Sequence, residues 1–107
     1  MSAKFLEFIQ TCVREKKIVW TYHVNMRLKG RFIPREFILN SANSYEIIEG
    51  YSQDKYLPSY LVYARYENEA FHILFAPDVK NDRVSIITTY KPDPVKWEKD
   101  LKTRRKS

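Results

Sequence analysis

The sequence predicts an α+β domain of two layers, in which N-terminal helices pack on a mostly antiparallel sheet of four to five strands. Three observations support this prediction. Residues 2–16 repeat apolar side chains at helical spacing, and the second half of the chain contains short apolar and aromatic runs between turn-forming segments. Aromatic residues make up 15% of the chain and include eight tyrosines, which favours sheet. A chain of 107 residues has the length of one domain with a single core.

Residues 2–16 are expected to form an amphipathic helix. Ser2 is a favourable N-cap residue, because its hydroxyl can accept a hydrogen bond from a backbone N–H of the first turn. Phe5, Ile9 and Val13 recur at intervals of four residues and share one face of such a helix. We expect this face to cover the sheet.

The next segment is expected to contain one strand and two short helices. A β-branched and aromatic run predicts the first strand at residues 18–21. The mixture of polar and apolar residues that follows predicts a helix at residues 23–29. Pro34 stands where the first residue of a helix is favoured, so a further short helix is expected at residues 34–42.

The second half of the chain is expected to form the rest of the sheet. Its β-branched and aromatic runs are short and follow one another closely, which is typical of antiparallel strands joined in sequence. The predicted strands are residues 45–51, 60–66, 71–76 and 84–90.

Residues 67–70, Glu-Asn-Glu-Ala, are expected to be the turn of a hairpin between two of these strands. Residues that face each other across a hairpin have side chains on the same face of the sheet. A four-residue turn at this position would place Arg65 directly across from His72.

The C-terminal part is expected to leave the sheet after two prolines, Pro92 and Pro94, which cannot donate to a strand ladder. A short helix is predicted at residues 95–101, and the basic residues 102–107 are expected to fray. The chain is therefore predicted to be one domain over residues 1–101, followed by a basic tail.

The composition excludes several classes of site. With only two glycines, the chain has no Gly-rich phosphate-binding loop. Its single cysteine, Cys12, cannot form a disulfide within the chain, and no cluster of Cys and His residues predicts a zinc site. We expect no cofactor. The first residues carry charges throughout, unlike a signal peptide, so a soluble cytoplasmic protein is expected.

The formal net charge is +6 and the pI about 9.5. The basic residues concentrate in residues 14–36 and 91–107, whereas acidic residues dominate residues 45–82. If the two basic segments lie side by side, they form one electropositive surface of the kind that binds RNA or DNA. An acidic protein partner would be attracted by the same surface.

Three basic side chains follow one another at intervals of four residues, at His23, Arg27 and Arg31. On one helix they would form a single stripe. A histidine where a strand meets a helix, followed by two arginines on the same side, suits a phosphate group or RNA. The alternative interpretation is a solvated basic face with a histidine that caps the helix or packs on the sheet.

The two histidines, His23 and His72, are the candidates for acid–base chemistry. Metal-independent cleavage of RNA needs a base for the ribose 2′-hydroxyl, cations for the phosphate, and an acid for the leaving oxygen. Histidine titrates near neutral pH and serves as acid or base. Arginine binds phosphate through two N–H groups, and Arg27 and Arg65 are each expected beside one histidine.

Further candidates complete this predicted site. Tyr90, at the end of the last strand, is a candidate proton donor or stacking surface, and Glu49 is a candidate general base. Arg31, Arg35 and Arg65 are candidates for binding RNA phosphates. Each has an alternative: His72 as a hydrogen-bonded histidine of the core or the sheet face, and Tyr90 as a packing residue.

Four blocks of the sequence resemble the motifs of one family. They are His23-Val24-Asn25-Met26-Arg27 with Arg31-Phe32-Ile33, then residues 46–51 with 54–61, residues 71–76, and residues 86–94 with Trp97. In this order they resemble the DUF4258 family, a domain of unknown function.

The resemblance implies a small α+β domain related to the RelE, ParE and BrnT toxins. In that group helices lie against a mostly antiparallel sheet, many members cleave RNA, often on the ribosome, and the gene frequently neighbours one for a small antitoxin. The polar positions that match the motifs are His23, Arg27, Arg31, His72 and Tyr90.

The sequence thus predicts a toxin-like, metal-independent endoribonuclease of a toxin–antitoxin type system. Its partners would be RNA or the ribosome, and an acidic antitoxin protein. The alternative is a non-catalytic module that binds nucleic acid or protein on the same basic surface. A third interpretation is an oligomeric structural protein whose exposed tyrosines form an interface.

Overall fold

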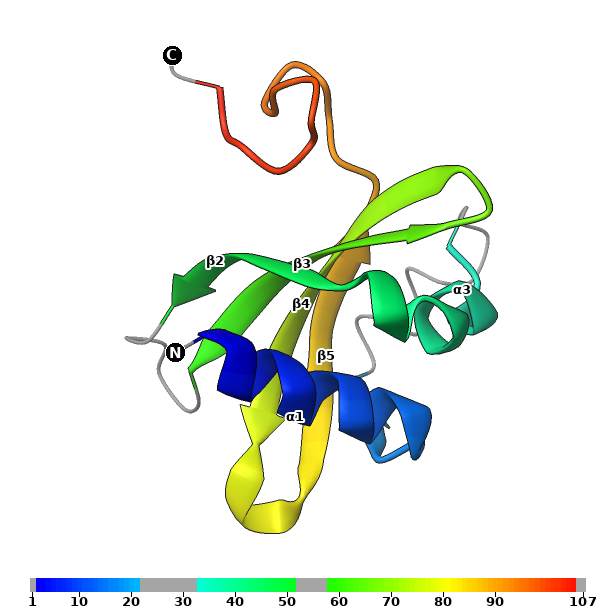
Figure 1. Cartoon of the computed structure of the whole chain (residues 1–107), viewed down its shortest axis with the longest axis vertical. Coiled ribbons are helices and arrows are strands. Elements are labelled where there is room, and N and C mark those ends of the chain that lie inside the picture. The colour runs from blue at the N-terminus through cyan, green and yellow to red at the C-terminus, as the bar shows by residue number, and fades with distance from the viewer. Residues whose placement is uncertain (1, 22–32, 52–57, 106–107) are drawn as a thin grey trace.

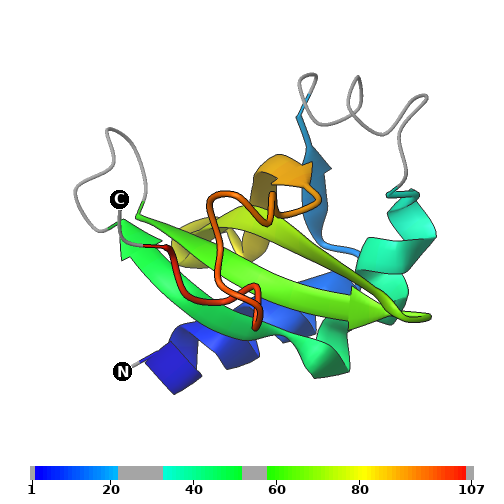
Figure 2. The same ribbon diagram turned by 90° about the horizontal axis from the view of Figure 1, so that it is seen from above.

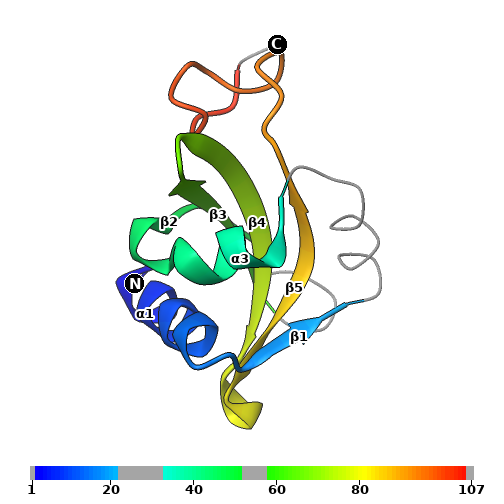
Figure 3. The same ribbon diagram turned by 90° about the vertical axis from the view of Figure 1, so that its right-hand side faces the viewer.

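The computed structural model describes residues 2–21, 33–51 and 58–105. Helices cover one face of a five-stranded mixed sheet whose strand order is β1-β5-β4-β3-β2 (Figures 1 and 3). β1 pairs with β5 in parallel, and the other neighbours are antiparallel. The elements are α1 (Ser2–Arg14), β1 (Ile18–Trp20), α3 (Arg35–Asn40), the 3₁₀ turn η1 (Ala42–Ser44), β2 (Glu46–Tyr51), β3 (Ser59–Tyr66), β4 (Glu69–Asp78), the 3₁₀ turn η2 (Val79–Asn81) and β5 (Arg83–Tyr90).

The predicted α+β class is confirmed, and so are the first helix, the first strand and the four later strands. The predicted helix at residues 23–29 lies outside the described residues, as do residues 52–57 of the predicted loop before β3. No helix in the described part of the chain is long and apolar enough to span a membrane.

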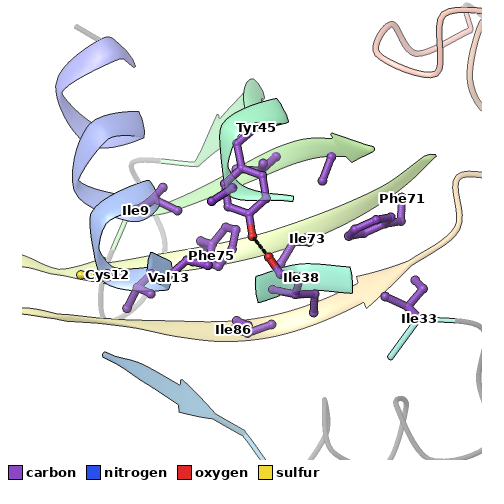
Figure 4. Close-up of a cluster of buried hydrophobic side chains, with 14 residues drawn as sticks. Ile9, Cys12, Val13, Ile33, Ile38, Tyr45, Phe71, Ile73, Phe75 and Ile86 are labelled. Carbon is purple, nitrogen blue, oxygen red and sulfur yellow. Dashed lines mark hydrogen bonds between the residues drawn. The ribbon is translucent and has the colours of Figure 1, made fainter. Parts of the chain in front are cut away.

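The main core lies between the helices and the sheet (Figure 4). α1 contributes Ile9 and Val13, which are buried because they recur on one face of the helix. Tyr45 packs its ring 5.5 Å from that of Phe75, and its hydroxyl donates a hydrogen bond of 2.7 Å to the carbonyl of Ile38. This bond gives the buried Tyr45 hydroxyl a partner, the carbonyl of Ile38 in α3. Burial raises the pKa of Tyr45 above its usual value.

The hairpin between β3 and β4 has a two-residue turn. Glu67 and Asn68 both have positive φ, at 50° and 69°, the conformation that matches the twist of the flanking strands. Arg65 therefore pairs with Ala70. The predicted pairing of Arg65 with His72 is wrong, because residues 69 and 70 belong to the strand rather than to the turn.

A bulge in β2 changes which side chains share a face. The register passes from Ile47 opposite Val62 to Glu49 opposite Leu61, so one residue of β2 has no partner on β3. Without a bulge, side chains three residues apart would point to opposite faces. With it, Glu46 and Glu49 both lie on the face of the sheet opposite α1.

The predicted helix at residues 95–101 is wrong. The chain instead folds into a small hairpin, residues 96–105, in which Trp97 pairs with Arg104 (Figure 2). Backbone bonds of 2.8 and 2.9 Å join residues 98 to 103 and 105 to 96. The Asp100 carboxylate accepts hydrogen bonds from the backbone N–H groups of Lys102 and Thr103, which favours a turn over a helix. Residues 103–105 of the predicted basic tail are paired with residues 96–98 in this hairpin.

Candidate functional site

The face of the sheet opposite the helices is polar at the end covered by the C-terminal hairpin. Tyr63, His72 and Tyr90 lie side by side across β3, β4 and β5, because Tyr63 pairs with His72 and His72 pairs with Tyr90. The register thus brings together two of the predicted site residues, His72 and Tyr90, from strands that sequence alone does not align.

His72 is completely buried. Its Nε2 lies 2.7 Å from the carbonyl oxygen of Leu101, which can only accept, so Nε2 carries the proton. Its Nδ1 lies 3.3 Å from the Tyr90 hydroxyl and therefore accepts a hydrogen bond from it. Burial lowers the pKa of His72, although the bond to Leu101 opposes this effect. The geometry holds a neutral imidazole whose two nitrogens are both engaged.

The C-terminal hairpin covers His72 with Trp97, which is only 2% exposed. The Trp97 ring meets the imidazole edge to face, with the ring centres 4.5 Å apart. The guanidinium of Arg104 lies 4.6 Å from the centre of the Trp97 ring, a cation–π distance. Trp97 therefore holds both the buried imidazole and the surface guanidinium in place.

Arg104 also binds the bulged strand. Its Nε and Nη2 donate to the two carboxylate oxygens of Glu49 at 2.6 and 3.2 Å, a bidentate pair. The Tyr51 hydroxyl donates to the same carboxylate. Partial burial favours the neutral acid, but the bonds from Arg104 and Tyr51 outweigh it and lower the pKa of Glu49. The carboxylate is thus ionised and oriented at neutral pH.

Tyr90 lies in the electrostatic range of this arrangement. Burial raises the pKa of Tyr90, Arg104 lowers it, and the negative charge of Glu49 raises it again. We call Glu49, Tyr51, Tyr90 and Arg104 the polar-face cluster. It combines a carboxylate, a guanidinium and two phenolic hydroxyls, with His72 bonded beneath Tyr90. A carboxylate can accept a proton, a phenolic hydroxyl can donate one, and a guanidinium can bind an anion.

Among the other predicted residues, only Arg35 and Arg65 belong to the described part of the chain, and neither is a member of the polar-face cluster. His23, Arg27 and Arg31 are outside the described residues, so their placement stays a prediction. Arg35 places its guanidinium 4.5 Å from the ring centre of Trp20, and Arg65 donates to the Tyr63 hydroxyl at 3.2 Å.

Ion pairs engage several basic residues of the two predicted basic segments, within the part of the chain that the structure describes. The acidic segment, residues 45–82, supplies partners to basic residues from both ends of the chain. The pairs in the described structure include Lys102 with Glu46, Arg104 with Glu49, Lys91 with Glu69, Arg83 with Asp78, and Lys17 with Asp82. Within the described residues, part of the positive charge expected at this surface is therefore paired with acidic side chains.

Sequence reasoning missed Arg104 and Tyr51 as members of a site. Arg104 falls in the segment predicted to fray, and Tyr51 lies at the end of an edge strand. A signal was nevertheless present. Lys102 and Arg104 alternate with neutral Thr103, as residues on one face of an extended segment do. Glu46 and Glu49 gave no matching signal, because residues three apart in a regular strand point to opposite faces and only the bulge brings them to one face.

The family model named Domain of unknown function (DUF4258) matches residues 20–91. The chain belongs to this family. The matched segment contains three members of the polar-face cluster, together with His72, and stops before Trp97 and Arg104. No curated protein and no solved structure matches the chain. In the described part of the chain, no three His, Cys, Asp or Glu side chains gather into a metal site.

Proposed function

We propose that this DUF4258 protein is a metal-independent endoribonuclease whose reaction centre is the polar-face cluster. The supporting observation is the Glu49 carboxylate, which is partly buried, ionised, and held by Arg104 and Tyr51. A fixed carboxylate beside a guanidinium provides a base and a phosphate-binding cation in one place.

In the proposed reaction Glu49 accepts the proton of a ribose 2′-hydroxyl. The 2′-oxygen then attacks the adjacent phosphorus, and the bond from phosphorus to the 5′-oxygen breaks. Arg104 turns an N–H from Glu49 to a phosphate oxygen, and the Tyr90 hydroxyl donates its proton to the leaving 5′-oxygen. The products are a 2′,3′-cyclic phosphate and a 5′-hydroxyl. Positioned groups of this kind typically contribute about 10²–10⁴-fold each to the rate.

His72 is a positioning residue in this proposal, because it is buried and contacts substrate only through Tyr90. Its Nδ1 fixes the direction of the Tyr90 hydroxyl. Arg27, Arg31 and His23 remain candidates for binding the RNA chain. A toxin-like role, with RNA or the ribosome as target and an acidic antitoxin as partner, is part of the proposal. Helices on a largely antiparallel sheet are compatible with a RelE-like relationship.

The test is cleavage of total RNA and of translating ribosomes by purified protein in EDTA. We expect cleavage by the parent protein and a loss of about 10²-fold or more in Glu49→Gln, which removes the base. Glu46→Gln is the matched control: it removes a carboxylate from the same strand and face, paired with Lys102 rather than with Arg104. Equal loss in both variants, or no cleavage by the parent, would refute the proposal.

A second candidate function is a binding module without catalysis. It is favoured by two observations: Glu49 and Arg104 are hydrogen-bonded to each other, and His72 is buried and hydrogen-bonded to Leu101. In the described structure these groups are therefore already engaged within the protein. This function predicts salt-sensitive binding of RNA, DNA or an acidic protein, with no cleavage product. Binding that is unchanged in Glu49→Gln would identify it.

A further inference from the structure

A second group of polar side chains lies beside the polar-face cluster, on the face of the sheet opposite the helices. Lys102 places its ammonium 4.9 Å from the centre of the Tyr63 ring, and the Arg65 guanidinium donates a hydrogen bond of 3.2 Å to the hydroxyl of the same ring. We call Arg65, Tyr63 and Lys102 the Tyr63 group. One phenol from β3 thus contacts two cationic side chains, one from its own strand and one from the C-terminal hairpin.

The Tyr63 group has more cations than paired acids. Arg65 is exposed and forms no ion pair with another described residue. Lys102 pairs with Glu46 at 2.8 Å, and this bond raises the pKa of Lys102, so the ammonium is charged at neutral pH. Glu67 and Glu69, at the β3–β4 turn, form no ion pair with either cation. Two cations therefore share one paired carboxylate, an arrangement that suits an anionic ligand.

Lys102 is also linked to the proposed reaction centre through the hairpin. It lies two residues before Arg104, so the Cα atoms of the two residues are at most about 7 Å apart. Both side chains reach the same face of the sheet, where Glu46 and Glu49 are their partners. Adjacent phosphates of an extended RNA chain are separated by a similar distance. If Arg104 binds the phosphate that is cleaved, Lys102 is therefore placed to bind a neighbouring one.

The proposed reaction sets the direction in which RNA crosses this face. Glu49, on β2, acts on the 2′-hydroxyl of the nucleotide before the cleaved bond, and Tyr90, on β5, acts on the 5′-oxygen of the nucleotide after it. RNA then runs from 5′ to 3′ from β2 towards β5. Lys102 is held near β2 by Glu46 and near β3 by Tyr63, two strands away from β5. The Tyr63 group is therefore on the 5′ side of the cleaved bond.

We propose that Arg65 and Lys102 bind the phosphate on the 5′ side of the cleaved nucleotide. Lys102 turns from Glu46 to this phosphate, and Arg65 donates through N–H groups that Tyr63 does not use. The substrate is then an RNA chain with two consecutive phosphates, the first at the Tyr63 group and the second at Arg104. The inference rests on the proposed function for the direction of the chain, whereas binding of the 5′ phosphate is measurable without cleavage.

The probes are two forms of the dinucleotide UpA: pUpA, with an added 5′-phosphate, and UpAp, with an added 3′-phosphate. UpAp is the matched control ligand, because both forms carry the same number of phosphates. Methylation of the uridine 2′-oxygen blocks the attack and hence cleavage. NMR titration of the full chain with the methylated forms measures both affinities. We expect pUpA to bind at least about tenfold more tightly than UpAp, because its extra phosphate gains charge-assisted hydrogen bonds.

Two variants identify the residues that cause this preference. Arg65→Gln and Lys102→Gln should each reduce the preference for pUpA over UpAp to about twofold or less. Arg65 lies on β3, so its variant tests the site without altering the hairpin. Lys99→Gln is the matched control, because Lys99 is exposed on the same hairpin, and it should keep the full preference. Circular dichroism verifies that each variant folds.

Failure of this proposal and failure of the proposed function give different results. Equal affinity for methylated pUpA and UpAp would overturn the phosphate site, and so would a preference that persists in Arg65→Gln or in Lys102→Gln. These outcomes hold whether or not RNA is cleaved. Unmethylated pUpA that stays intact, while methylated pUpA binds preferentially through Arg65 and Lys102, would refute cleavage and support the phosphate site.

Discussion

Replacing Trp97 by alanine should detach the C-terminal hairpin from the sheet. Trp97 is 2% exposed, packs edge to face on His72 and supports the Arg104 guanidinium. Truncating a buried tryptophan to alanine typically costs about 3–5 kcal/mol, and loss of the cation–π contact adds about 0.5–1 kcal/mol. Because one side of this hairpin faces solvent and can relax, we expect the lower end, about 3 kcal/mol.

The assay is urea unfolding of the parent and of Trp97→Ala, followed by circular dichroism so that loss of the tryptophan does not alter the signal. A decrease of about 3 kcal/mol corresponds to a lower melting temperature by roughly 12–24 °C for a domain of this size. Val95→Ala is the control: Val95 is 78% exposed in the same segment and should cost under about 0.5 kcal/mol. A cost below about 1 kcal/mol for Trp97→Ala would refute the packing argument.

Three further predictions concern stability. Burial lowers the pKa of His72 from its unfolded value near 6.5. The neutral imidazole therefore contributes fully to the free energy of unfolding above that pH, and this contribution is lost as the pH falls through the lower folded value. Between pH 7.5 and pH 5.5, urea unfolding should show a smaller loss of stability in His72→Gln than in the parent, and equal losses would contradict the buried imidazole. Tyr45→Phe removes the bond to Ile38 and should cost about 1–2 kcal/mol; an unchanged urea midpoint would show that this bond contributes nothing. Asn68→Gly suits the positive φ of 69°, whereas Asn68→Val should cost about 1 kcal/mol or more; thermal unfolding that ranks valine at or above glycine would exclude this turn.

Local patterns sufficed to predict most of the fold. The apolar repeat of α1 and the β-branched run of β5 have one plausible structure each, because each pattern matches one backbone period. The turn between β3 and β4 was harder, because Glu67-Asn68 lacks the glycine that usually marks a two-residue turn. The predicted register therefore differs from the observed one by two residues. Arg65 lies on the face of the sheet that was predicted, but it pairs with Ala70 instead of His72.

The C-terminal hairpin could not be predicted in the same way. Its short cross-strand pair, Trp97 with Arg104, depends on the sheet beneath it, and residues 95–101 taken alone are equally compatible with about two helical turns. The bulge in β2 also arises from pairing with β3, so the shared face of Glu46 and Glu49 is a tertiary effect. The candidate site therefore depends on features that only the folded chain reveals.

The most direct test of the proposed function is the identity of the RNA ends. A short single-stranded RNA is incubated in EDTA with the parent protein, Glu49→Gln and Glu46→Gln, and the products are identified by mass spectrometry. The proposal predicts fragments with 2′,3′-cyclic phosphate and 5′-hydroxyl ends from the parent and from Glu46→Gln, and about 10²-fold fewer from Glu49→Gln. Intact RNA in all three reactions, or the same fragments in equal amounts, would contradict a reaction centre at Glu49.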